Sequence, residues 1–252
     1  MSTIREIISS AYDRLEEAHW NIHQMEENYH ESDPFRFALN SFIRVIKEVP
    51  QILQMELQNR DGFKEWYINR RRLTTQDPLI SDLFKKRDIV VHKSMLRPKS
   101  SAVLGITEGR GFKLGLGLPL DPFQDSDVLI IQYLFLNNEK EGEEDIFGIL
   151  GSDEESLPCI ERHWGLDPFE EGILELAVQA WNTIASLIND TVIWLGEDPS
   201  ELHLTLKCIH SSAAVSVRTY RRDWIQTINS DIKKGIEFYE AMYKLKVLRH
   251  RA

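Results

Sequence analysis

Three polar residues near the end of one predicted helix, Arg87, Asp88 and His92, have the types and the spacing for acid–base chemistry. Asp88 and His92 are four positions apart, which places both side chains on one face of a helix, one turn apart. A carboxylate in that position can orient an imidazole and hold one tautomer. Arg87 shares its face with apolar residues at 80, 84 and 91, where a guanidinium is costly unless it pairs with a carboxylate or a phosphate.

The charges of the chain are unevenly distributed. The stretch from Arg60 to Lys99 has a net charge of +6, the stretch from Arg218 onward +5, and the stretch from Asp121 to Glu201 −18. A charge run is most often a solvated face. The functional alternative is that the two basic stretches adjoin and bind phosphate groups, while the acidic stretch shields them or meets a partner. The residues of the first basic stretch that we expect to contact phosphate are Arg70, Arg71, Arg72, Lys85, Lys86 and Lys93.

A second basic group interleaves cations with aromatic rings: Arg218, Tyr220, Arg221, Arg222 and Trp224. This pattern is suited to stacking RNA bases. The structural alternative places Trp224 in the core and the arginines outside.

The order Arg87, polar Asp88, three intervening residues and then His92, late in a series of helices, resembles the HEPN superfamily (higher eukaryote and prokaryote nucleotide-binding proteins). The resemblance covers residues 1–98. It implies a helical bundle, and many members are metal-independent endoribonucleases that act as toxins or defence effectors. It also implies that His92 is the general acid or base at a ribose 2′-hydroxyl and that Arg87 stabilises the phosphate, leaving a cyclic phosphate end.

The same resemblance implies RNA as the substrate, a homodimer that brings two motifs into one cleft, and a possible protein antitoxin or regulator. No cofactor is implied. The spacing alone is not specific, because Arg14 and His19 repeat it in the first predicted helix without a polar residue after the arginine.

Three alternatives stay open. A catalytically silent HEPN-like module would bind RNA, a nucleotide or a protein through the same cleft. In a purely structural alternative, Arg87 and Asp88 make salt bridges between helices, and the helix dipole favours His92 at the C-terminus. In the third, acidic residues bind a basic partner: Glu141, Glu143, Glu144 and Asp145.

The sequence predicts no metal site. Cys159 with His163, and Cys208 with His210, could together supply four zinc ligands. Neither pair has a familiar zinc-finger spacing, however, and a buried cysteine behaves as a small hydrophobic residue.

Hydrophobic periodicity predicts a helix-dominated α+β protein. We expect three regions: a helical bundle over 1–98, an antiparallel β insertion with an acidic loop over 99–165, and a helical C-terminal region over 166–252 packed on the bundle. Strands are expected at 102–107, 112–118 and 128–136, the first two as a hairpin. A second hairpin is expected at 202–209 and 214–220, one long helix from 167 to 195, and a final helix from 229 to 249.

The composition of the 252 residues, 42% hydrophobic and 28% charged, is that of a globular protein and excludes disordered and coiled-coil chains. A net charge of −10 argues against a protein coated all round with nucleic acid. Two cysteines fit a reducing compartment. Without an apolar leader or a membrane-spanning stretch, we expect a cytoplasmic protein that does not contact membranes.

Overall fold

The computed structural model describes residues 4–108, 111–119, 123–138, 156–202 and 208–251. The fold is helix-dominated α+β, as the sequence predicts. The chain divides into two compact units. Unit 1 comprises Met1–Glu27, Pro34–Arg97 and Pro168–Ser211, and unit 2 comprises Asn28–Asp33, Pro98–Asp167 and Ser212–Ala252. The region expected as one helical C-terminal segment, 166–252, is therefore divided between both units.

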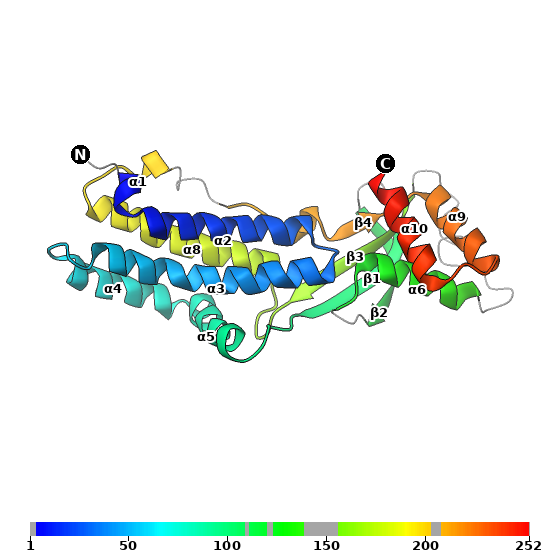
Figure 1. The fold of residues 1–252 in the computed structure, drawn as a ribbon, viewed down its shortest axis with the longest axis horizontal. Helices are drawn as coiled ribbons and strands as arrows, with labels where there is room; N and C mark the ends of the chain where they lie inside the picture. The colour runs from blue at the N-terminus through cyan, green and yellow to red at the C-terminus, as the bar shows by residue number, and fades with distance from the viewer. Residues whose placement is uncertain (1–3, 109–110, 120–122, 139–155, 203–207, 252) are drawn as a thin grey trace. The chain divides into compact units, whose positions relative to one another are not determined.

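Unit 1 is a helical bundle. Its elements are α1 (Ile4–Ile7), α2 (Ser9–Glu27), α3 (Ser32–Leu57, whose first two residues belong to unit 2), α4 (Phe63–Gln76), α5 (Pro78–His92), α8 (Ile173–Trp194) and the short 3-10 helix η1 (Pro199–Leu202). Figure 1 shows α2, α3 and α8 running alongside one another. Helix α8 packs against α2 and α4, so the bundle is completed by a segment far along the chain from its other helices.

Apolar stripes at helical spacing build the core of this bundle. The α2 stripe is buried at Ala11, Leu15, Ala18, Ile22 and Met25, and the α3 stripe at Phe35, Leu39, Phe42, Ile46, Val49, Leu53 and Leu57. Full burial of one large aliphatic or aromatic side chain contributes about 1.5–3 kcal/mol. The stripes therefore fix how α2 and α3 face the rest of the bundle.

Helix α5 begins with a capped first turn. Asp77 is its N-cap, and the Asp77 carboxylate accepts hydrogen bonds from the backbone N–H groups of Leu79 (2.8 Å) and Ile80 (3.2 Å), with Pro78 in the first turn. The apolar face of α5 is buried at Ile80 and Leu83 but becomes exposed toward the C-terminus, where Val91 is 42% exposed. The last turns of α5 thus lie outside the core.

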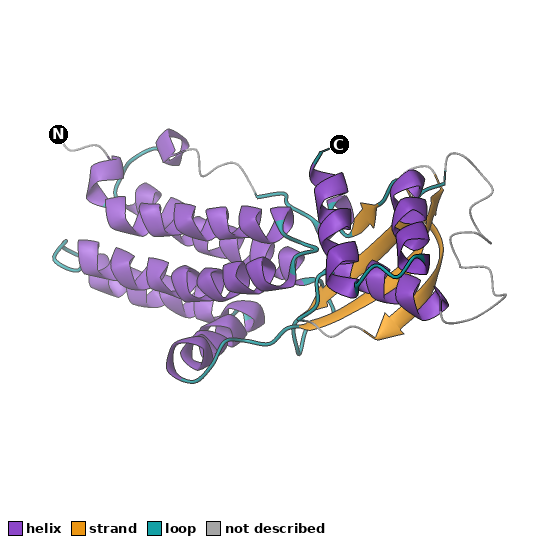
Figure 2. Ribbon diagram, turned by 45° about the vertical axis from the view of Figure 1, so that its right-hand side comes forward, coloured by secondary structure: helices purple, strands orange, loops and turns teal. Residues whose placement is uncertain are grey.

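Unit 2 contains a four-stranded antiparallel sheet in the order β2-β1-β3-β4. The strands are β1 (Lys99–Glu108), β2 (Gly111–Pro119), β3 (Pro158–Gly165) and β4 (Val217–Thr219). Leu104 lies opposite Ile160 in the register of β1 with β3, and both belong to the core. Figure 2 shows α6 (Ser126–Asn138), α9 (Arg222–Lys233) and α10 (Phe238–His250) against one face of the sheet. The short 3-10 helix η2 (Ser212–Ala214) precedes β4.

Several local predictions are confirmed and others are wrong. The β1–β2 hairpin is confirmed, as is the end of the helix predicted at 167–195, just before Gly196, a residue with φ 80°. That helix, α8, begins at Ile173 and not at 167. The predicted strand at 128–136 is helix α6, because a short apolar run fits a buried helix as well as a strand, and this one packs against α9, α10 and β3. The predicted final helix is broken at Gly235, whose φ is 92°.

The second predicted hairpin, at 202–209 and 214–220, is tested only in part. Strand β4 pairs with β3, and Leu202 lies in a 3-10 helix. The residues 203–207 of that expected hairpin lie outside the described residues, as do Glu141, Glu143, Glu144 and Asp145 of the acidic stretch. Among the described residues, no helix is both long and apolar enough to cross a membrane.

Candidate functional site

The residues that the sequence singles out, Arg87, Asp88 and His92, lie on the last turns of α5 in unit 1. The Asp88 carboxylate accepts a hydrogen bond from Lys47 Nζ of α3 at 2.7 Å, and Arg87 Nη1 is 3.4 Å from the same oxygen. These two cations, the Lys47 hydrogen bond foremost, lower the pKa of Asp88. Asp88 thus links α5 to α3, as the structural alternative expects.

His92 is exposed at the C-terminus of α5. Its imidazole makes no hydrogen bond with any residue that the structure describes, so Asp88 does not orient it here. Arg87 and His92 are five positions apart, which places their side chains about 140° apart around a helix of 3.6 residues per turn. One copy of α5 therefore does not point both groups at the same phosphate.

The six predicted phosphate contacts fall into two groups. Two already have partners within unit 1: Arg70 pairs with Asp190 of α8, and Lys86 pairs with Asp82 at 2.6 Å. The other four are exposed and make no ion pair with any described residue: Arg71, Arg72, Lys85 and Lys93. These four cations are available to an anionic ligand.

A cavity of about 420 Å³ lies between α3 and the end of α5. We call it the α3–α5 cavity; it is lined by Phe37, Asn40, Ser41, Arg44, Val90, Val91 and Met95. Phe37 is 52% exposed, and Arg44 is exposed with no ion-pair partner among the described residues. Asn40 accepts a hydrogen bond from the backbone N–H of Leu96 at 2.8 Å, which holds the chain after α5 against α3. The cavity thus combines an aromatic ring, a cation and amide or hydroxyl groups next to His92.

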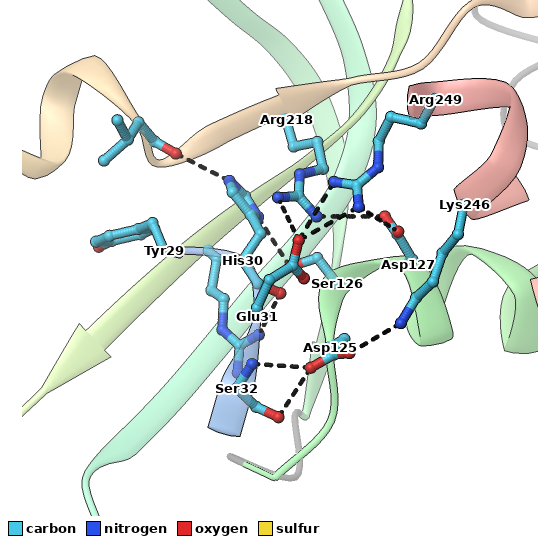
Figure 3. Close-up of polar contacts among 12 residues, drawn as sticks. Tyr29, His30, Glu31, Ser32, Asp125, Ser126, Asp127, Arg218, Lys246 and Arg249 are labelled. Atoms are coloured by element: carbon cyan, nitrogen blue, oxygen red, sulfur yellow. Dashed lines mark hydrogen bonds and ion pairs between the residues drawn. The ribbon is translucent and has the colours of Figure 1, made fainter. Parts of the chain in front are cut away.

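A second polar cluster, which the sequence does not reveal, lies inside unit 2. We call it the unit 2 charge network; its charged members are Glu31, Asp125, Asp127, Arg162, Arg218, Lys246 and Arg249. Figure 3 shows Glu31 and Asp127 beside the guanidinium groups of Arg218 and Arg249. The acids come from the α2–α3 connection, from α6 and from the residue just before it, and the cations come from β3, β4 and α10.

Asp127 is the most buried acid of this network, with 0% exposure. Its carboxylate accepts a hydrogen bond from Tyr220 Oη at 2.7 Å and contacts Arg218 at 3.4 Å and Arg249 at 3.2 Å. Glu31 Oε1 lies 3.0 Å from Nη2 of Arg218 and 3.3 Å from both Nη1 and Nη2 of Arg249. Burial, and then the charge of Asp127, raises the pKa of Tyr220 well above its usual value. Each acid thus faces cations, and we infer that the cluster has a structural role in unit 2.

Arg162 and Asp125 complete the network. Arg162 is fully buried, stacks on the Trp164 ring at 3.9 Å and donates to the backbone oxygen of His30 at 3.2 Å, while burial lowers its pKa to about 10. Burial alone would raise the pKa of Asp125, but hydrogen bonds from Ser32, together with Lys246, outweigh it and lower that pKa. These contacts fasten residues 30–32 to the sheet and to α10.

His30 is the buried neutral member of this cluster. Its Nε2 lies 2.9 Å from the backbone oxygen of Val215, so Nε2 carries the proton, and Nδ1 accepts from the Ser126 hydroxyl at 2.8 Å. Burial, and then the charge of Arg218, lowers the pKa of His30 to about 3. His30 is therefore neutral at physiological pH and serves as a fixed hydrogen-bonding group.

The described residues best placed to hold a metal ion are His19, His23 and His210 of unit 1, whose ligand atoms lie within 4.8 Å of one another. The four zinc ligands considered from the sequence belong to different units: Cys159 and His163 to unit 2, Cys208 and His210 to unit 1. Burial raises the pKa of Cys159 to about 12, so this thiol stays protonated. The spacing of His19 and His23 was visible in the sequence, but no local pattern connects them to His210.

Comparison with known proteins gives one match. Residues 7–109 match the model of the family described as bacteriophage lambda protein ea47. The matched segment runs from the end of α1 to the end of β1 and includes α5, and it leaves out α8 and most of unit 2. Searches of curated proteins and of solved structures find no match to this chain.

Proposed function

We propose that this protein binds single-stranded RNA through the α3–α5 cavity and the exposed cations beside it. The proposal rests on the HEPN-like motif of α5 and on one structural observation. That observation is that an exposed aromatic ring, Phe37, and an unpaired cation, Arg44, line one cavity. Proteins that bind single-stranded RNA combine these two features, since bases stack on aromatic rings while cations follow the phosphates.

The size and the lining of the cavity support this ligand class. A volume of about 420 Å³ is within the range of sites that take small organic groups, which runs from about 300 to 1,000 Å³. Ser41 supplies a hydroxyl group for the edge of a base, and Val91 and Met95 supply apolar contacts. The cavity therefore fits a splayed-out base better than a bare phosphate.

The cations of α5 supply the electrostatic part. Lys85 and His92 are seven positions apart, so they lie on the same face of α5, and Lys93 follows directly. Exposed cations contribute to affinity by releasing counterions from the nucleic acid, so binding should weaken steeply with salt. The overall charge of −10 disfavours binding over the whole surface.

The test is fluorescence anisotropy of the full chain with a labelled single-stranded RNA of mixed sequence, across a salt series. We expect Phe37→Ala to weaken binding at least about 5-fold, because one base–aromatic stack contributes about 1–3 kcal/mol. Arg44→Ala should weaken binding and reduce the salt dependence by about one phosphate contact. The matched control is Lys234→Ala, a cation of unit 2 that is 73% exposed. Equal affinity of all four proteins would refute the assignment.

RNA cleavage by His92 is the second candidate function. The observation that favours it is the exposed imidazole at the end of α5, next to Lys93 and to the α3–α5 cavity. His92 would remove or donate the proton at a ribose 2′-hydroxyl, and Arg87 would stabilise the phosphate. Since one α5 does not direct both groups to one phosphate, this reaction requires two copies, as the HEPN resemblance implies.

An assay on mixed RNAs in EDTA separates the two candidates. Cleavage by the wild type, with cyclic phosphate ends, and its loss in His92→Ala at equal folding and oligomeric state would establish the ribonuclease. RNA binding that survives His92→Ala, without cleavage by either protein, would leave the binding function alone.

A further inference from the structure

We propose that His19, His23 and His210 form a zinc site in unit 1, separate from the residues proposed to bind RNA. The three imidazoles place their ligand nitrogens within 4.8 Å of one another. Neutral imidazole is a preferred ligand of zinc, and three histidines leave a fourth coordination position for water. All three side chains are partly exposed, so an ion can reach them from solvent.

Two of the ligands are positioned by one helix. His19 and His23 are four positions apart on α2, so both side chains leave the same face, one turn apart. Their ring centroids are 4.7 Å apart. The buried α2 stripe holds this helix in the bundle and thereby fixes the face from which both imidazoles project.

The third ligand, His210, is held by two contacts with α8 on either side of it. The Asn182 side chain accepts from the backbone N–H of Cys208 at 3.1 Å and donates to the Cys208 backbone oxygen at 3.3 Å. The Ser211 hydroxyl donates to Glu175 Oε1 at 3.2 Å. The chain is thus tied to α8 just before and just after His210, which brings its ring within 4.1 Å of His23.

A carboxylate completes the arrangement. His210 Nδ1 lies 2.5 Å from Glu26 Oε2, and Glu26 is on α2, one turn after His23. With its proton on Nδ1 and donated to Glu26, His210 keeps the lone pair of Nε2 for a metal ion. Metal-binding histidines usually have such a partner, which sets the tautomer and increases the basicity of the ligand nitrogen.

Ring packing alone is the competing explanation. The His19 ring lies 4.8 Å from the Trp181 ring, and the three imidazoles contact one another at their edges. Packing accounts for the closeness of the rings, but it does not use the ligand nitrogens of His19 and His23. His19 and His23 form no hydrogen bond with any described residue, so their nitrogens are free to bind an ion.

The spacing of the nitrogens fits an ion with a small adjustment. Zinc–nitrogen bonds of about 2.0–2.1 Å in a tetrahedral site set the ligand nitrogens about 3.4 Å apart. An upper separation of 4.8 Å therefore requires the rings to close by about 1.4 Å at the widest pair. Rotation of partly exposed imidazoles about their side-chain bonds provides this movement.

The experiment is a zinc titration of the full chain by isothermal calorimetry, after EDTA treatment and dialysis. We expect one zinc ion per chain. His23→Gln and His210→Gln should each weaken binding at least about 100-fold, and Glu26→Gln about 10- to 100-fold. The matched control is His163→Gln, an exposed histidine of β3 in unit 2, which should bind zinc as the wild type does.

Cobalt(II) provides a readout that does not depend on stability. A tetrahedral site gives cobalt an intense visible absorption band, which His23→Gln should abolish while circular dichroism shows the helices retained. Zinc binding that is absent in the folded wild type, or unchanged in both His23→Gln and His210→Gln, would overturn the proposal. Loss of zinc binding in these two variants, with RNA affinity unchanged, supports it independently of the proposed RNA function.

Discussion

The unit 2 charge network and the histidine cluster of unit 1 both gather ionisable side chains from distant segments, but only the first pairs opposite charges. In the network, Asp127 and Glu31 face Arg218 and Arg249, so each buried charge has an opposite partner. In the cluster, three imidazoles meet, and Glu26 is bonded to only one of them.

The pairing of charges within the protein distinguishes a structural polar cluster from one that can bind a ligand. A network of paired opposite charges stabilises one arrangement of the chain, because each charge already has a partner. A cluster of like groups whose ligand atoms are not used by the protein gains most when a cation enters. The stability of the network should depend on mutation and pH, and the stability of the histidine cluster should depend on a metal ion.

The largest effect should come from breaking the network at its centre. Asp127→Ala leaves two guanidinium groups and the Tyr220 hydroxyl without their shared acceptor, and removal of one partner of a buried ion pair costs about 3–5 kcal/mol. Urea unfolding followed by circular dichroism measures this loss. Asp223→Ala is the control, because its ion pair with Arg221 is 58% exposed on both sides and its loss should not be measurable. Equal stability of the two variants would show that the network does not stabilise unit 2.

The second-largest effect is expected at the histidine cluster. Zinc at about 100 times its dissociation constant should stabilise unit 1 by about 2.7 kcal/mol. Hydrogen-exchange mass spectrometry locates this effect, since zinc should slow exchange in α2 and α8 and leave α9 and α10 unchanged. Equal protection of both sets of helices would contradict a site confined to unit 1.

A smaller effect is expected from pH. His30 has a pKa of about 3 in the folded protein and an ordinary value near 6.5 when unfolded, so the unfolded chain binds a proton first as the pH falls. Stability should therefore decline below about pH 6.5 by about 1.4 kcal/mol per pH unit, reaching about 2 kcal/mol at pH 5. The groups facing His30 that oppose its protonation are Arg162, Arg218 and Arg249.

Urea unfolding at pH 7 and pH 5 measures this decline. His30→Gln keeps a donor and an acceptor at this position but does not titrate. It should lower stability at pH 7 and lose the part of the pH slope that His30 contributes. An unchanged slope in His30→Gln would assign the pH dependence to other groups.

The smallest effect is expected at the exposed end of α5. Asp88→Asn removes the ion pair with Lys47, but the Asp88 side chain is 55% exposed, so the stability should change little. The same substitution removes a negative charge next to Lys85 and His92 and should tighten RNA binding slightly, most clearly at low salt. Weaker RNA binding in Asp88→Asn would instead show that this carboxylate positions a group that contacts RNA.

The helical stripes and caps were predictable because they are local. The buried positions of α2 and α3 follow from their spacing, and the Asp77 cap follows from residue type. The helix at 128–136 was not predictable, because a short apolar run fits a buried helix as well as a strand and its periodicity does not separate the two. Its helical state is set by packing against α9 and α10.

The polar clusters were not predictable because their members are far apart in the chain. Arg249 meets Glu31 across 218 positions, and His210 meets Glu26 across 184. A sequence motif detects fixed short spacings, and no such spacing connects these pairs. Conversely, Arg87, Asp88 and His92 have the expected spacing, but the Asp88 carboxylate accepts a hydrogen bond from Lys47 and not from His92.

The alternation of the two units along the chain has a consequence for biosynthesis. Residues 98–167 of unit 2 leave the ribosome before α8 completes unit 1, while β4, α9 and α10 are made later still. During that interval the outer edge of β3 has no partner strand, and an unpaired edge is a template for aggregation. The nascent chain therefore passes through a period in which neither unit is complete, and that is when a chaperone would have most to protect.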